Sequence, residues 1–216
     1  LNPSVGGPIV RDRFWFFGSY SRSVADAYVA FVDDVDANAL TYTESNTQTI
    51  DDQNVHDLAL RLTMQLTPRN KLQFYVDDNT VCHCHFLVGT AIGVSVMQSA
   101  AVYNTRDIQL YQLNWTSTVS SRLLVDAAFS SMVSDYPFLT QPNVDSTLPG
   151  VIDAGGITRA HRGIAAWYPP GRKNWLIFDN TYAARASVSY VTGSHAAKFG
   201  TSITRGNSDR IQDGFE

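Results

Sequence analysis

The order of long and short connections along the chain is the feature that most restricts its possible folds. Apolar and polar residues alternate with period two, and this pattern predicts seven β-strands, at about 13–24, 54–66, 71–79, 105–118, 121–133, 176–191 and 195–206. The connections between them alternate between long and short. We expect the long ones at about 25–53, 80–104 and 134–175, and the short ones at 67–70, 119–120 and 192–194.

This order indicates an all-β fold, namely a partial antiparallel up-and-down transmembrane β-barrel. Every second connection of such a barrel lies on the same side of the membrane, and outer-membrane barrels have tight periplasmic turns and long extracellular loops. About seven strands would form a sector of a larger barrel. We therefore expect the strands to contact outer-membrane lipid on one face and the barrel interior on the other.

The alternation also assigns residues to the two faces, most clearly over residues 58–66. We expect one set of polar residues to face the inside of the barrel: Gln73, Asp77, Gln112, Asn114, Asp126, Arg185, Ser187, Ser189 and Lys198. We expect an apolar set to face lipid: Phe74, Val76, Leu113, Trp115, Val125, Phe129, Val188, Tyr190 and Phe199.

Aromatic residues are frequent near the short-turn ends of the predicted strands. Strands favour aromatic residues in general, so any single one carries little information. Taken together, they predict one aromatic girdle at the periplasmic interface. Its members would be Phe14, Trp15, Phe16, Phe17, Trp115, Tyr190 and Phe199.

Composition argues against two other classes of protein. The net charge is -4 and the basic residues are scattered, so there is no basic stripe and we expect no nucleic-acid partner. No run of 18 apolar residues occurs, which argues against a transmembrane helix. A soluble all-β binding or adhesion module, in which the same strands pack against a second sheet, stays open as the alternative.

Cys82, His83, Cys84 and His85 follow one another directly in the sequence. Four such ligand types could bind zinc, but neighbouring residues of a strand point to opposite sides and could hardly all reach one ion. We favour an extracellular surface loop in which the two thiols are oxidised or paired locally, and we expect no metal.

The sequence shows no motif for catalysis, so we expect no enzyme and no cofactor. The longest connection, at about 134–175, instead has the aromatic and basic content of a recognition surface. We expect it to contact an extracellular ligand, the alternative being an irregular loop that packs on itself. The candidate ligand-binding residues are Arg162, Trp167, Tyr168 and Arg172.

Three stretches carry a resemblance to a known family. Residues 6–18 read Gly-Gly-Pro-Ile-Val-Arg-Asp-Arg-Phe-Trp-Phe-Phe-Gly, and further strings lie at 115–124 and 188–195. These resemble, in the same order, the Oar-like TonB-dependent receptors, in which the first string joins an N-terminal plug to the barrel. The resemblance implies a junction at residues 1–12 and the N-terminal portion of the barrel domain at residues 13–216.

The resemblance further implies a 22-stranded barrel with a plugged lumen, of which this chain would be the first third. It implies energised uptake or binding of a large ligand. The expected partners are the protein's own plug domain, its remaining barrel strands, an inner-membrane TonB complex and an unknown extracellular ligand. We therefore expect this chain to be a fragment of a bacterial outer-membrane transporter.

Overall fold

The computed structural model describes residues 1–29, 33–36, 41–44, 49–86, 102–139, 151–152, 158–159 and 172–214. Side chains are described for 1–28, 50–86, 103–139 and 175–212. The described part of the chain holds no helix long and apolar enough to cross a membrane. Its strands are β1 (Ser4–Val10), β2 (Phe14–Val29), β3 (Asp33–Asp36), β4 (Thr41–Glu44), β5 (Thr49–Thr67), β6 (Asn70–Phe86), β7 (Val102–Ser120), β8 (Leu123–Asp135), β9 (Phe138–Leu139), β10 (Val151–Ile152), β11 (Thr158–Arg159), β12 (Arg172–Thr192) and β13 (His195–Gly214).

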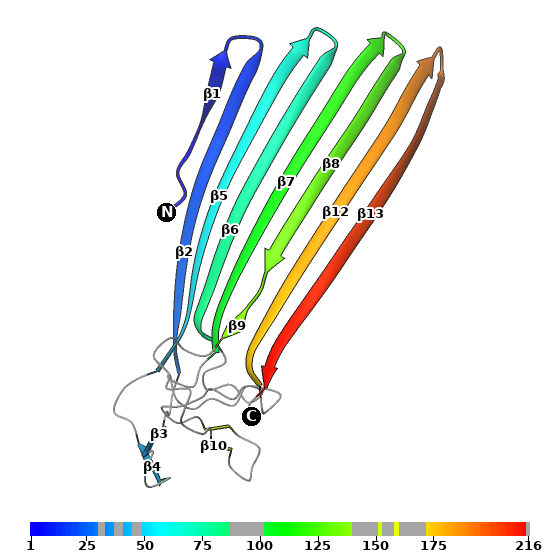
Figure 1. Cartoon of the computed structure of the whole chain (residues 1–216). Coiled ribbons are helices and arrows are strands. Elements are labelled where there is room, and N and C mark those ends of the chain that lie inside the picture. The colour runs from blue at the N-terminus through cyan, green and yellow to red at the C-terminus, as the bar shows by residue number, and fades with distance from the viewer. Residues whose placement is uncertain are drawn as a thin grey trace.

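One antiparallel sheet contains all the long strands. They lie side by side in the order of the sequence, β1-β2-β5-β6-β7-β8-β12-β13, with β9 between β7 and β12 (Figure 1). Each long strand therefore pairs with the strands before and after it, which is the up-and-down topology that the sequence predicted. Two separate two-stranded sheets, β3-β4 and β10-β11, complete the described strands.

Short turns join the strands at one end of the sheet, the upper end in Figure 1. They comprise residues 11–13, 68–69, 121–122 and 193–194, while the strand ends that border the longer connections lie at the opposite end of the sheet. Two of these turns need a left-handed backbone, with a φ of 63° at Asp12 and 55° at Gly193. Aspartate and glycine are among the residues that adopt this conformation most readily. The alternation of connection lengths is confirmed.

The strands are longer than predicted, so several predicted boundaries were wrong. β6 runs on to Phe86 and β12 starts at Arg172, so that the connections at 25–53, 80–104 and 134–175 all lose residues to the strands. The predicted turn at 119–120 belongs to β7. Toward the long connections apolar and polar residues no longer alternate regularly, so the pattern that predicted the strands ends before the hydrogen-bond ladder does.

β1 is a strand that the sequence analysis did not predict, because glycine and proline are uncommon in strands. It lies at the edge of the sheet and pairs only with β2. Gly6 is required there, since a Cβ atom at this position would lie 3.0 Å from the backbone oxygen of Phe16. Residues 1–12 thus contribute a strand to the same sheet, and their assignment to a plug junction stays a prediction.

The register of the sheet confirms the predicted division into two faces. Residues directly opposite each other on neighbouring strands project to the same side. One row runs from Gln73 through Asn114 to Ala128, Arg185 and Ser202, and is polar at most positions. We call the side that carries this row the polar face. The neighbouring row, on the opposite side, is apolar over five strands and contains Phe16, Leu62, Phe74, Leu113 and Phe129.

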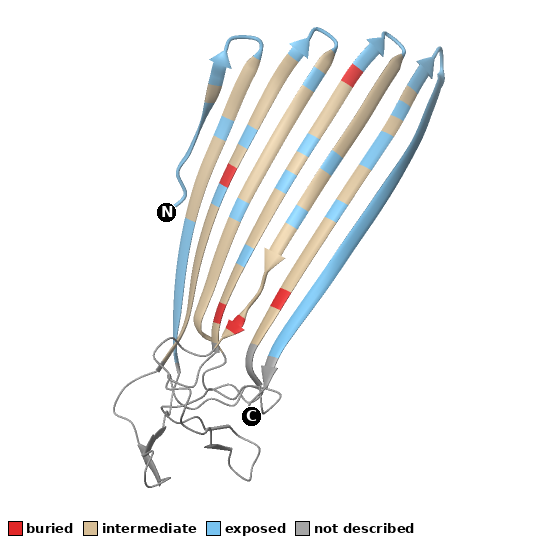
Figure 2. Ribbon diagram, in the orientation of Figure 1, coloured by how far each residue is buried: buried red, intermediate tan, exposed pale blue. Residues whose placement is uncertain are grey.

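The apolar face has no protein partner in the described part of the chain. In the described part of the chain the buried hydrophobic residues are Ala59, Phe138 and Ile177, and all three lie on the polar face; Figure 2 shows how few positions of the sheet are buried. On the apolar face, Phe199 is 75% exposed. A soluble sandwich would cover this face with a second sheet, and the described strands provide none. The apolar surface therefore needs a non-aqueous surrounding.

The apolar band ends well before the strands do. On this face Asp78 lies opposite Leu58, and Asp107 lies opposite Asp135 on the neighbouring strand. Two carboxylates directly opposite each other repel and require water. The strands thus have an apolar part near the short turns and a polar part near the long connections.

Tyrosines mark the boundary between these two parts. Tyr111 and Tyr182 lie on the apolar face, on either side of Ser131. Tyr182 and Tyr190 are eight residues apart in β12, which corresponds to about 26 Å along the strand. Aromatic residues are enriched at both interfaces of outer-membrane barrels, so these positions fit the two edges of a membrane. The sequence analysis predicted only the girdle near the short turns.

The predicted girdle itself needs a correction. Trp15 lies opposite Thr63 and Phe17 lies opposite Arg61, which places both on the polar face. Strict alternation along β2 separates them from Phe14 and Phe16. The other five predicted members lie on the apolar face.

A charge on the apolar face should destabilise the barrel far more than the same charge on the polar face. We expect Leu62→Arg to lower the free energy of unfolding by about 2–4 kcal/mol, because the side chain lies within the apolar band. Thr63→Arg is the matched control, since it adds the same charge on the polar face. Urea unfolding of the full chain from lipid vesicles measures both. Equal losses would contradict this assignment of faces.

Candidate functional site on the polar face

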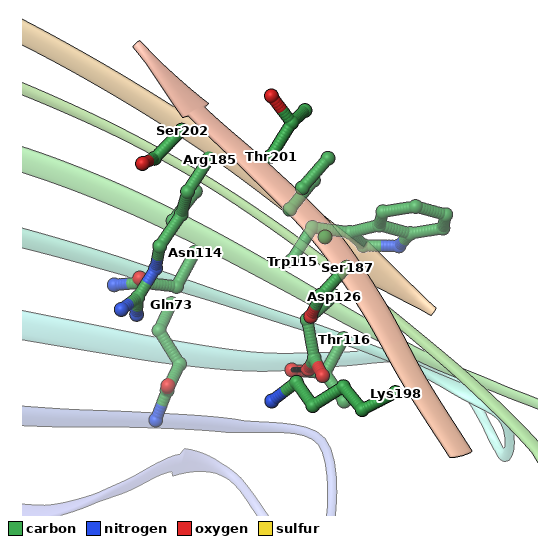
Figure 3. Close-up of a pocket in the computed structure, with 14 residues that line it drawn as sticks. Gln73, Asn114, Trp115, Thr116, Asp126, Arg185, Ser187, Lys198, Thr201 and Ser202 are labelled. Carbon is green, nitrogen blue, oxygen red and sulfur yellow. Dashed lines mark hydrogen bonds between the residues drawn. The ribbon is translucent and has the colours of Figure 1, made fainter. Parts of the chain in front are cut away.

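A polar hollow of about 660 Å³ lies on the polar face, in the half of the sheet near the short turns. Gln73, Asn114 and Arg185 line it from one row of the register, and Figure 3 shows their side chains extending to the same side. Trp115 points away from them in Figure 3, as its place on the apolar face requires. The charged side chains that line the hollow, Asp126, Arg185 and Lys198, all belong to the polar face.

Both signs of charge are present around this hollow. Lys198 and Arg185 supply positive charge, and Asp126 supplies negative charge. The Thr116 hydroxyl donates a hydrogen bond of 2.9 Å to the Asp126 carboxylate. Such mixed donors and acceptors suit contact with a polar surface. In the described part of the chain no group of three or more His, Cys, Asp or Glu residues is arranged to hold a metal ion.

A second cluster lies on the polar face near the long connections, and its aromatic part we call the aromatic shelf. The shelf comprises Phe86, Tyr136, Phe138 and Trp175. Phe138 is buried and stacks on Trp175 with 5.5 Å between ring centroids and 23° between planes. The ring of Tyr136 lies 4.6 Å from that of Phe138. These contacts make the shelf the main packed apolar cluster among the described residues.

β9 places Phe138 in the shelf. It continues the ladder of β8 after a break at Tyr136 and Pro137, and Phe138 lies opposite both Asn104 and Trp175. The buried Asn104 amide donates a 2.8 Å hydrogen bond to the Pro137 carbonyl oxygen. Phe138 and Trp175 flank the longest connection in sequence. The shelf therefore holds the two ends of that connection together.

Cys82 and Cys84 form a disulfide, with their Cα atoms 5.2 Å apart. The predicted local pairing of the thiols is confirmed. Their predicted location in a loop was wrong, because both lie in β6. The prediction ended the strand too early since polar and small residues replace the apolar alternation after Val76.

The disulfide coincides with an irregularity in the sheet. The register between β6 and β7 shifts between His83, which lies opposite Asn104, and Phe86, which lies opposite Val102. Two residues of β6, Cys84 and His85, thus lie opposite one residue of β7, Tyr103, which is a bulge. The extra residue moves Phe86 to the polar face, where it joins the aromatic shelf.

A further contact fixes the strand beside the bulge. The backbone N–H of His85 donates a 2.7 Å hydrogen bond to the Asp52 carboxylate, whose oxygen also lies 3.1 Å from Nδ1 of the His85 ring. The end of β6 is therefore tied to β5 as well as to the shelf.

The ligand-binding residues predicted from the sequence are not placed by the structure. Arg162, Trp167 and Tyr168 lie outside the described residues. Arg172 is the first residue of β12, opposite Gly214, and its side chain is not described. The sequence analysis missed the aromatic shelf. The signal available was that aromatic residues stand at both ends of the longest connection, at 136–138 before it and at Trp175 after it.

Comparison with known proteins decides what kind of sheet this is. A family model described as outer membrane beta barrel domain matches residues 21–216. The chain belongs to this family. A search of curated proteins and a search of solved structures found no significant match. As an outer-membrane β-barrel, it lies in the outer membrane with the apolar face against lipid. The polar face is the inner wall of the barrel.

The bulge of this outer-membrane β-barrel should act on stability through Phe86. In a double-mutant cycle, Phe86→Ala should lower the free energy of unfolding by about 1–3 kcal/mol when the disulfide is present. When Cys82→Ser and Cys84→Ser remove the disulfide, the loss caused by Phe86→Ala should be smaller by at least about 0.5 kcal/mol. We expect this because the bulge would relax without the disulfide, and Phe86 would no longer reach the shelf. Urea unfolding of the full chain from lipid vesicles measures the cycle.

Phe74→Ala is the control for this cycle, since Phe74 lies on the lipid-facing side and away from the bulge. Its effect should be the same with and without the disulfide. Strictly additive effects of the disulfide and Phe86 would contradict the coupling.

Proposed function

We propose that the chain forms part of the barrel wall of an Oar-like TonB-dependent receptor, which binds a large extracellular ligand and takes it up with energy from an inner-membrane TonB complex. The observation that carries this proposal is the string at residues 6–18, which resembles the start of the barrel in that family. In this chain the string folds as the first hairpin of the sheet, from β1 through the turn at Asp12 to β2.

The residues of this string have roles that fit the opening of a barrel. Gly6 allows β1 to approach the backbone of Phe16 closely, and Asp12 supplies the left-handed turn. Phe14 and Phe16 lie on the lipid-facing side near the short turns. The hairpin therefore combines turn, close strand contact and membrane anchor in one short segment.

The edges of the sheet favour a larger barrel. In the described part of the chain, β1 pairs only with β2 and β13 pairs only with β12. An unpaired edge inside a membrane leaves backbone N–H and C=O groups without hydrogen-bond partners, at a cost of several kcal/mol for each group. We propose that the remaining strands of a 22-stranded barrel pair with these edges, and that a plug domain of the same protein contacts the polar hollow.

Ligand recognition is proposed for the long connections. These would face the outside of the cell, and Arg162, Trp167, Tyr168 and Arg172 remain the candidate contacts in the longest of them. We propose that the chain has no enzymatic activity of its own. The alternative of a soluble binding module was wrong, because the family match places the chain in the outer membrane.

The orientation of the barrel can be tested in intact cells. The two native cysteines are paired, so a single introduced cysteine is the only free thiol of the chain. A membrane-impermeant maleimide should label Asp153→Cys, in the longest connection, and should not label Asn70→Cys, beside a short turn. The opposite labelling pattern would show that the barrel has the reverse orientation in the membrane. Labelling of both positions after cell lysis is the control.

The receptor proposal can be tested by asking whether the protein contacts TonB. The full-length protein in living cells should form a chemical crosslink to TonB, detected by mass spectrometry of the purified adduct. Adding ligand is not required for this measurement. The control is a porin of the same membrane that does not interact with TonB, and it should give no crosslink. Absence of the crosslink, with normal amounts of folded protein, would favour a passive or adhesive barrel.

A further inference from the structure

Two arginines flank the aromatic shelf on the inner wall of the barrel. Arg106 is on β7 and Arg210 is on β13, directly opposite Ile177. Tyr136 lies next to Ile177, whose carbonyl oxygen accepts a 2.8 Å hydrogen bond from the Tyr136 N–H. Arg106, Tyr136, Ile177 and Arg210 thus belong to one row across the sheet, in which the two arginines lie on either side of Tyr136 and Ile177.

Each guanidinium lies over an aromatic ring of the shelf. The Arg106 Cζ is 4.0 Å from the centroid of the Tyr136 ring, and the Arg210 Cζ is 5.9 Å from that of the Trp175 ring. A guanidinium stacked on a ring uses its flat face, which leaves the N–H edge able to bind a carboxylate in two places. The rings therefore hold the arginines without neutralising them.

Neither guanidinium forms an ion pair with an acidic residue in the described part of the chain. The one ion pair found among those residues joins Asp52 and His85. Asp179 lies on the same face of β12, two residues from Ile177, and still forms no ion pair with Arg210 within 4.0 Å. Arg106 is half-buried, and a charge that is taken out of water without a charged partner is costly unless an anion or an ordered water satisfies it. The arrangement thus combines an apolar surface with two open positive groups.

The shelf rests on a packed apolar base. Phe138 and Ile177 are each only 7% exposed and form its base. Tyr136 and Trp175 are each half-buried. Arg210 is exposed, and Arg106 is half-buried. A ligand could therefore reach both rings and guanidinium groups without opening the packed base.

We propose that the aromatic shelf with Arg106 and Arg210 is a binding site for organic anions, specifically ligands that carry a carboxylate on an aromatic or flat apolar body. The body packs on Tyr136 and Trp175, and the carboxylate accepts hydrogen bonds from a guanidinium edge. This deepens the proposed receptor function, on which it rests for its biological role, by naming the chemical class of ligand. The binding itself does not require TonB.

The test measures binding of 2-naphthoate and of the neutral 2-naphthamide to the full-length protein in lipid nanodiscs. We expect the acid to bind at least about tenfold more tightly than the amide, because a charge-assisted hydrogen bond discriminates between them. Arg106→Gln and Arg210→Gln should each remove most of this preference. If Arg106→Gln fails to fold, Arg210→Gln still tests the proposal. Arg210 is exposed at the edge of the shelf, so its replacement should leave the fold intact.

Arg61→Gln is the matched control. Arg61 also lies on the inner wall over an aromatic ring, 5.4 Å from the centroid of Tyr75, but away from the shelf. The preference for the acid should be unchanged in this variant. No binding of 2-naphthoate, equal binding of acid and amide, or an equal loss in Arg61→Gln would overturn the proposal. Because the protein is purified without TonB, a missing TonB crosslink would leave this result intact.

Discussion

The whole structure depends on the need to satisfy backbone hydrogen bonds where water is absent. Lipid offers no partner for an N–H or C=O group, so a chain that crosses the membrane as strands must pair each strand with its neighbours. The up-and-down order provides this with the shortest possible connections at one end. Side chains are then free to differ completely between the two faces, and the period of two between apolar and polar residues follows directly.

This constraint explains what could be predicted from the sequence. The seven strands, the faces of residues such as Gln73 and Arg185, and the alternation of connections all follow from the period of two and from turn chemistry. The rest depended on features without a periodic signal. Between the tyrosines at 111 and 182 and the long connections, apolar and polar residues no longer alternate regularly, so the ends of the strands could not be predicted. β1 was missed because the glycines that permit its close pairing are also typical of loops.

The candidate site was less accessible to sequence reasoning than the fold. The aromatic shelf unites Phe86, Tyr136 and Trp175 from three separate segments, and one of these reaches the polar face only because a bulge shifts the register. Periodicity alone places Phe86 on the opposite side. The arginines at 106 and 210 are more than a hundred residues apart. Only the pairing order of the strands brings them to one row, and no local pattern marks them.

The strict register of the barrel wall limits how the sequence of such a chain can evolve. Inserting or deleting one residue within a strand would exchange the two faces along all the sequence up to the next turn, and lipid would then meet the charges of the lumen. Length changes are therefore confined to the long connections and to bulges such as the one at 83–86. Recognition can diversify by growth and shrinkage of the outer loops while the wall stays almost fixed in length.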